Sequence, residues 1–353
     1  MLKFDPVRRI FYKIRDKIFE LLISEEKMEI IGKLRKKEWI LLCSVMVVFS
    51  FFAACGKEKE PIEDTPSITV PPADIYTFTD DLGREVRVSS HKRVAALLGS
   101  YADMWVLAGG ELCAAPDDAF EDFGLTLSDE VVSLGGTKSL SLELLLSADP
   151  DLVLASTNTT QHLEWQEALS GAGIAVAYFD VACFEDYLRV LKICTDLTGQ
   201  EKCYEQYGEE LKEKIENVLA RCKDKKAPRV LFMRASAASI RAKGNEGNVL
   251  GEMLMGFGCA NIADTDEHLL ENLSVESIAL QDPDKILVLP VGDDLDAARQ
   301  GVEEMFEENP LWKELTAVKN GEVYYLDKYL FNLKPNARWA EAYEELETIL
   351  YAE

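Results

Sequence analysis

Basic and aromatic side chains gather on loops that directly follow predicted strands, and this pattern is the strongest pointer to chemistry in the chain. In open α/β domains, ligands bind beyond the carboxyl ends of the strands. Guanidinium and ammonium groups there would bind an anion, and aromatic rings would add flat apolar contact. The residues that we predict to bind ligand are Ser100, Tyr101, Lys138, Trp165, Arg234, Arg241, Lys328, Tyr329 and Arg338.

Further loop residues of the same kinds are Asn158, Lys243 and Lys334. Arg234 and Arg338 each adjoin an apolar element that would hold the guanidinium in place. The alternative is that Arg241 and Lys328 are solvated loop charges. The chain as a whole carries a net charge of −25. Basic residues on these loops are therefore informative, whereas the acidic surface makes nucleic-acid binding improbable.

Motifs for nucleotide, zinc or nucleophilic chemistry are absent from the sequence. It contains no GxGxxG after a strand, no GxxxxGK[ST], no HExxH, no GxSxG and no CxxC. His91, His162 and His268 lack the spacing of zinc ligands, although a lone histidine, Tyr101 or Tyr329 would suffice as an axial ligand of haem. A glycine-rich loop at 244–248 precedes a predicted helix and could cradle an anion. We therefore predict no enzyme and no metal held directly by the protein, with a surface enzyme as the alternative.

A short segment occurs twice, at 141–154 and 274–287, and aligns without a gap. Each copy reads Ser, an apolar residue, Glu, one or two helical turns, Asp-Pro-Asp and a strand. The serine can cap the helix, and Glu143 or Glu276 then lies in the first turn, where the helix dipole favours a carboxylate. Capping alone would explain both glutamates. Alternatively, two related halves each present one acidic group to a two-fold symmetric partner.

The N-terminal region predicts export. Basic residues precede an apolar run at 39–52, and two alanines then precede Cys55, as in a bacterial lipoprotein signal. We predict that residues 1–54 are leader and signal peptide, with Met28 as an alternative start, and that Cys55 carries lipid on the outer face of the cytoplasmic membrane. An uncleaved anchor helix is the alternative. Six further cysteines follow, either in disulfides or as small buried residues.

Strand and helix patterns divide the rest of the chain. Residues 55–74 are charged and contain several prolines, which is typical of a flexible tether. Short apolar strands alternate with helices in two stretches, 75–183 and 227–353, which predicts two lobes with parallel sheets. Residues 184–226 repeat apolar positions at helical spacing, so we expect linking helices that include one long helix.

Together these motifs resemble a known family. The hairpin "FTDDLGREV", the strand "KRVAAL", the two Ser-x-Glu segments and "PLWKELTAVKNGEVYYLD" are similar to ABC-transporter substrate-binding proteins for iron–siderophore, haem and cobalamin uptake. The resemblance covers residues 76–351. It implies two Rossmann-like lobes bridged by one long helix, the class III periplasmic-binding-protein fold, with ligand in the cleft between the lobes.

The resemblance also implies partners. Glu143 and Glu276 would dock on arginines of an ABC permease dimer, the protein would act as a monomer, and the cargo would be a small metal chelate. A ferric siderophore is the expected ligand because of the basic loops, and cobalamin or haem is the alternative. Phe52 stands where the lipoprotein signal usually has leucine, which is a departure from the pattern.

Overall fold

The computed structural model describes residues 75–351 of the chain. The predicted leader, Cys55 and the tether lie outside these residues. Within residues 75–351, no helix has the length and apolar character needed to cross a membrane. The six cysteines in this range are all free thiols: Cys113, Cys183, Cys194, Cys203, Cys222 and Cys259.

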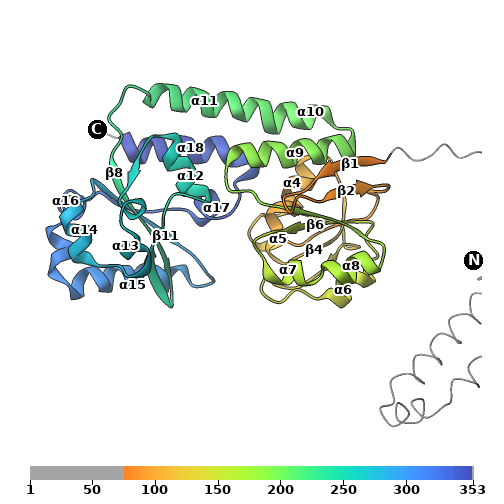
Figure 1. Ribbon diagram of the computed structural model, residues 1–353, viewed down its shortest axis with the longest axis horizontal. Helices are drawn as coiled ribbons and strands as arrows, with labels where there is room; N and C mark the ends of the chain where they lie inside the picture. Colours follow the sequence, from red (N-terminus) through yellow and green to blue (C-terminus); the bar gives the residue numbers. More distant parts are fainter. Residues whose placement is uncertain (1–74, 352–353) are drawn as a thin grey trace, which may run out of the picture. The chain divides into compact units, whose positions relative to one another are not determined.

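The first lobe is built on a five-stranded parallel sheet (Figure 1). Its strands are β3 (Val94–Ala96), β4 (Leu112–Ala115), β5 (Val132–Ser133), β6 (Leu152–Ser156) and β7 (Ala175–Phe179), in the order β5-β4-β3-β6-β7. Its helices are α4 (Gly99–Leu107), α5 (Asp118–Glu121), α6 (Leu142–Ser147), α7 (Thr160–Glu164) and α8 (Gln166–Gly171). The predicted hairpin is confirmed as β1 (Tyr76–Thr79) and β2 (Glu85–Val88), with Gly83 at a φ of 74° in its turn.

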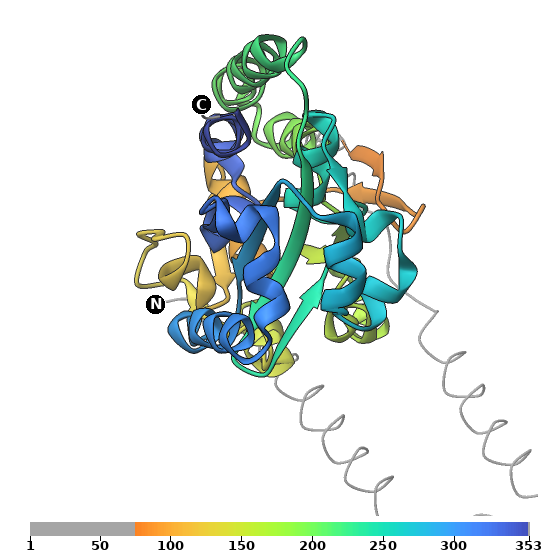
Figure 2. The ribbon, with the colours of Figure 1, turned by 90° about the vertical axis from the view of Figure 1, so that its left-hand side faces the viewer.

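The second lobe has a mixed sheet in which β9 alone runs antiparallel. Its strands are β8 (Arg229–Ser236), β9 (Ser239–Ala242), β10 (Ala260–Asn261), β11 (Lys285–Pro290) and β12 (Val323–Tyr325), in the order β10-β8-β11-β12 with β9 on β8. Its helices include α12 (Val249–Gly256), α13 (Glu267–Glu271), α14 (Val275–Gln281), α15 (Leu295–Glu308), α16 (Thr316–Lys319), α17 (Lys328–Phe331) and α18 (Trp339–Tyr351). Figure 2 views this lobe end on, with α11 and α18 above its sheet.

The linking segment consists of two helical runs. The first is α9 (Phe184–Thr198), which ends where Gly199 adopts a φ of 69°. The second joins α10 (Glu201–Tyr204), a π-helical turn at Glu205–Glu209 and α11 (Glu210–Cys222). This second run is the long helix expected from the sequence, and it extends over both lobes (Figure 1).

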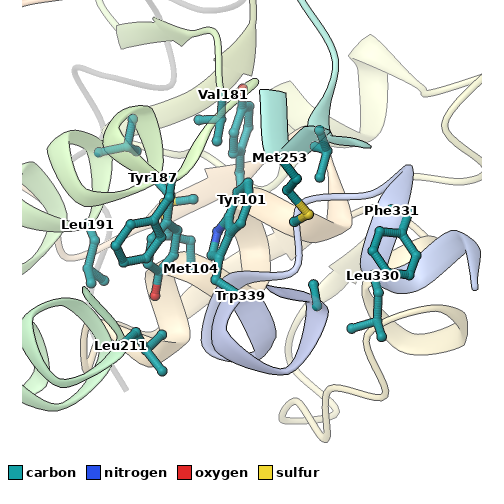
Figure 3. Close-up of a cluster of buried hydrophobic side chains, with 14 of the residues drawn as sticks. Tyr101, Met104, Val181, Tyr187, Leu191, Leu211, Met253, Leu330, Phe331 and Trp339 are labelled. Carbon is teal, nitrogen blue, oxygen red and sulfur yellow. The ribbon is translucent and has the colours of Figure 1, made fainter. Parts of the chain in front are cut away.

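One hydrophobic core joins the two lobes. Alternate residues of each central strand point into it: Leu152 and Leu154 from β6, and Leu287 and Leu289 from β11. The intervening residues of these strands face a separate core within each lobe. Figure 3 shows the shared core, where Trp339 lies in a cluster with Tyr101, Met104, Tyr187 and Met253. The helices α4, α9, α11, α12 and α18 thus cover one face of both sheets.

Candidate ligand-binding site

A pocket lies between the lobes at the carboxyl ends of their strands. The first lobe contributes Asn158 and Asp180, which follow β6 and β7, and the second contributes Arg234 from β8 and Leu289 from β11. Its volume is about 150 Å³. Pockets that enclose a whole small-molecule ligand usually measure about 300–1,000 Å³. In this arrangement of the lobes, the pocket therefore has room for only part of a large ligand.

The lining of the pocket is strongly basic. Arg234, Lys243 and Lys334 face one carboxylate, Asp180. Within residues 75–351, none of the three cations has a carboxylate oxygen within the 4.0 Å of an ion pair. The Asp180 carboxylate instead accepts a hydrogen bond from Asn158 Nδ2 at 2.8 Å. The pocket therefore gathers three basic side chains around one carboxylate, and none of the three forms an ion pair with a described residue, as an anion site requires.

Arg234 is held at the end of β8. The strand pairs with both β9 and β11, so its backbone is fixed on both sides. One guanidinium nitrogen donates to Asn332 Oδ1, whereas Nε is buried and has no partner among the described residues. Burial lowers the pKa of the Arg234 guanidinium. A ligand oxygen would supply the acceptor that Nε lacks.

Lys334, on the segment after α17, also lines the pocket. Its Nζ lies 5.7 Å from the centre of the Tyr101 ring, and the face of this ring attracts the ammonium charge. Burial lowers the pKa of the Lys334 ammonium, although the Asp180 and Asp118 carboxylates oppose this shift. Tyr101 itself is 1% exposed and donates from its hydroxyl to the Phe179 carbonyl at 2.8 Å. It therefore supports Lys334 from the core and does not line the pocket.

The glycine-rich loop at 244–248 also reaches the pocket. Gly247 and Asn248 line it, and Asn248 caps α12 by accepting from the Gly251 backbone N–H at 3.0 Å. Gly251 is required here, because a Cβ at this position would lie 2.0 Å from the Asn245 carbonyl oxygen. The amino-terminal end of α12 thus faces the pocket, where its partial positive charge adds to that of the lysines and the arginine.

Three predicted ligand-binding residues instead form contacts between the lobes. Lys328 Nζ lies 3.0 Å from Asp122 Oδ1, and the Tyr329 hydroxyl donates to the same oxygen at 3.2 Å. Lys138 Nζ lies 3.7 Å from the Asp293 carboxylate, where both side chains are highly exposed. The Asp122 carboxylate satisfies Lys328 and Tyr329 without a ligand and joins the two lobes, whereas the exposed Lys138–Asp293 pair contributes little.

The remaining predicted residues lie elsewhere. Ser100 is buried and accepts at its carbonyl from Asn336 Nδ2 at 2.8 Å. Trp165 belongs to the core of the first lobe, between α7 and α8. Arg338 is exposed and pairs with Glu341 at 2.7 Å. Arg241 is exposed on β9, beside a second hollow. The structure thus brings only Arg234 of the nine to the pocket.

Two polar lining residues were missed from the sequence, Asp180 and Asn332. Asp180 directly follows β7, so the same strand-end rule could have found it. Asn332 lies between Tyr329 and Lys334, both of which were named, but it is neither basic nor aromatic and so gave no signal.

The duplicated glutamates are both exposed on the surface. Ser141 and Ser274 cap α6 and α14 through hydrogen bonds from Leu144 and Ser277, as predicted. Neither Glu143 nor Glu276 forms an ion pair with a described residue, but the Glu276 carboxylate accepts a hydrogen bond from the Ser274 hydroxyl at 3.1 Å. Glu276 thus takes part in the cap of its helix, whereas only Ser141 caps α6.

Two α/β lobes, one with a parallel sheet and one with a mixed sheet, and a basic pocket between them define a two-lobed solute-binding fold. The chain belongs to the periplasmic binding protein family, which it matches over residues 94–330. A solved ABC transporter substrate-binding protein from Listeria monocytogenes EGD-e has the same fold, with a TM-score of 0.63 and 21% identity over 75% of this chain and 100% of that one. The class III fold predicted from the sequence is therefore confirmed.

Relatives in Bacillus subtilis (strain 168) extend over most of the chain. One is YhfQ, described as an ABC transporter substrate-binding lipoprotein, at 27% identity over 87% of this chain and 95% of YhfQ. Another is an iron-uptake system-binding protein, at 26% identity over 77% of this chain and 85% of that protein.

Proposed function

We propose that this chain is an exported, lipid-anchored solute-binding protein that captures an anionic iron chelate and delivers it to an ABC importer. The observation that carries the proposal is that three basic side chains, Arg234, Lys243 and Lys334, line the pocket between the lobes together with one carboxylate, Asp180. The descriptions of the two Bacillus relatives support the transport role, the iron cargo and, for YhfQ, the lipid anchor that we assign to Cys55.

A ferric siderophore with carboxylate or other anionic groups fits the pocket better than haem or cobalamin. The residues that line the pocket include no histidine, tyrosine, methionine or cysteine, the side chains that usually bind haem iron. Cobalamin carries less negative charge and would leave the three cations without partners. Haem and cobalamin remain the alternative cargoes and are tested alongside the siderophores.

Capture would involve a modest separation of the lobes. The pocket of about 150 Å³ is too small for a whole chelate, and the ion pair between Asp122 and Lys328 joins the two lobes. The shared hydrophobic core and the long helix resist a large hinge motion. We expect ligand to enter when this pair opens and to be retained when it closes.

Titration of the purified full chain in detergent tests the ligand. We expect saturable quenching of tryptophan fluorescence by one of ferric hydroxamate, ferric catecholate or ferric citrate, and none by haem or cobalamin. Arg234→Ala should weaken that binding by about 10- to 100-fold, because it removes a charge-assisted hydrogen bond. Arg338→Ala is the matched control, since it removes the same charge outside the pocket. Equal losses in both variants, or quenching by haem alone, would contradict the assignment.

Docking on the importer is a second part of the proposal. We expect Glu143→Lys combined with Glu276→Lys to abolish uptake of radioactive iron in cells that lack the wild-type copy. Affinity for the chelate should stay unchanged, because both residues lie outside the pocket. The control is Glu167→Lys with Glu303→Lys, which reverses two exposed charges on α8 and α15. Normal uptake by the first pair of substitutions would disprove docking through these glutamates.

A further inference from the structure

The two walls of the pocket carry opposite kinds of polar group. All three cations of the lining, Arg234, Lys243 and Lys334, belong to the second lobe. The first lobe contributes Asn158 and Asp180, whose side-chain oxygens are hydrogen-bond acceptors. A ligand that is bound between the walls therefore meets donors on one side and a carboxylate on the other.

The Asp180 carboxylate has acceptor positions to spare. Its Oδ1 accepts a hydrogen bond from Asn158 Nδ2 at 2.8 Å, whereas Oδ2 accepts none from a residue in the range 75–351. No cation in that range lies within the 4.0 Å of an ion pair with either oxygen. An ionised carboxylate offers about four acceptor positions, so most of those on Asp180 are open to a ligand.

Asp180 is held in place through its backbone. Its N–H donates to Asp81 Oδ2 at 2.6 Å, and its carbonyl oxygen accepts from an Arg189 guanidinium nitrogen at 3.4 Å. Arg189 also pairs with Asp81 at 2.9 Å, so the three residues form one network. Because the backbone is fixed, binding a ligand at the carboxylate costs little conformational entropy.

On the second-lobe wall, the side-chain acceptors are already occupied. Asn332 Oδ1 accepts from the Arg234 guanidinium, and Asn248 Oδ1 accepts from the Gly251 backbone N–H at 3.0 Å. Asp180 is the one carboxylate among the residues that line the pocket. An ammonium group on a ligand would therefore find its counter-ion on the first lobe alone.

We propose that the ligand is bipolar: an anionic chelate that also carries an ammonium group, with the ammonium bound by Asp180 and the anionic groups bound by the cations of the second lobe. The inference rests on the proposed function, because it takes this pocket as the ligand site. Asp180 would select such a ligand in two ways. It forms a charge-assisted hydrogen bond with the ammonium, and it repels a ligand that places a second anionic group there.

Two iron-free probes of matched length test this selectivity. Glutarate and δ-aminovalerate share one carboxylate and differ at the other end, which is a carboxylate in the first and an ammonium in the second. In NMR titrations of the full chain in detergent, we expect the wild type to bind δ-aminovalerate about tenfold more tightly than glutarate, the effect of one charge-assisted hydrogen bond.

Asp180→Asn should remove this preference, because it deletes the charge but keeps the size of the side chain and an oxygen that accepts from Asn158. Asp129→Asn is the control, since Asp129 is an exposed residue of the same lobe outside the pocket, and it should keep the preference. The inference would be overturned by a wild type that fails to bind δ-aminovalerate or binds both probes equally. An unchanged preference in Asp180→Asn would also overturn it.

Ferric chelates separate this inference from the proposed cargo. A ferric citrate amide with a pendant primary amine should bind the wild type more tightly than its N-acetylated form, and Asp180→Asn should bind both forms equally. Equal binding of both forms by the wild type would overturn the inference and leave the iron cargo intact. The expected preference for δ-aminovalerate, without binding of any ferric chelate, would support the bipolar site and count against the iron cargo.

Discussion

Trp339→Ala should lower the free energy of unfolding by about 4 kcal/mol, the usual cost of removing a buried tryptophan. The Trp339 side chain is fully buried in the core shared by the lobes, 5.8 Å from Phe184 and 6.3 Å from Tyr187 between ring centres. Its indole N–H has no acceptor among the described residues, so packing alone stabilises it. Because α18 packs against both halves through this side chain, the loss should affect both lobes equally.

Hydrogen exchange tests this prediction, because it measures the protection of each strand separately. Protection of β6 in the first lobe and of β11 in the second should fall by the same free energy in Trp339→Ala. Trp312→Ala is the control, because Trp312 is also buried but lies in the separate core of the second lobe, stacked on Phe306 at 4.9 Å. It should reduce the local protection of β11 more than that of β6. Loss confined to one lobe in Trp339→Ala would show that the shared core does not couple them.

Local sequence patterns predicted strands and helices well where one physical property, such as continuous hydrophobicity, dominated the segment. The apolar strands β6 and β11 are buried on both faces, and so their sequences are almost continuously hydrophobic. Strands β4, β5, β9 and β10 were not predicted. All four are short: β5 and β10 have two residues each and β4 and β9 have four, so none gives a period to detect. The position of Trp339 between the lobes depends on contacts with residues far apart in the chain, such as Tyr101 and Phe184, which a local pattern does not show.

The candidate site was predictable as a region but not residue by residue. The strand-end rule located the pocket because it depends only on chain direction. It could not distinguish Arg234 from Lys328, because Lys328 is neutralised by an ion pair with Asp122. Asp122 lies about two hundred residues away in sequence, so a local pattern does not show this pair. Arg338 pairs with Glu341 on its own helix turn. That spacing was visible in the sequence and could have favoured a surface role for this arginine.

His162 should make the protein lose stability between pH 6.5 and pH 4. Burial lowers the pKa of His162 from 6.5 to about 4. Its Nδ1 accepts a hydrogen bond from the Ser156 backbone N–H at 3.1 Å, so the neutral ring carries its proton on Nε2, which is buried without a partner. Protonation would place a second donor opposite the Ser156 N–H. The unfolded chain binds the proton near pH 6.5 and the folded chain only near pH 4, so acid favours unfolding across this interval.

The expected loss is about 3 kcal/mol, from a shift of about 2.5 pKa units at ~1.36 kcal/mol each. Asp118 acts in the opposite direction, since burial raises the pKa of its carboxyl group to about 6. The effect of His162 is therefore the difference between wild type and His162→Gln in the loss of unfolding free energy on acidification. The glutamine amide oxygen can still accept the hydrogen bond from the Ser156 backbone N–H. Denaturant unfolding at pH 7 and pH 4 should show the wild type losing about 3 kcal/mol more than this variant.

His268→Gln, at an exposed histidine, should lose as much as the wild type. Equal losses in wild type and His162→Gln would mean that His162 is protonated in the folded protein, and that the first lobe opens to water around it.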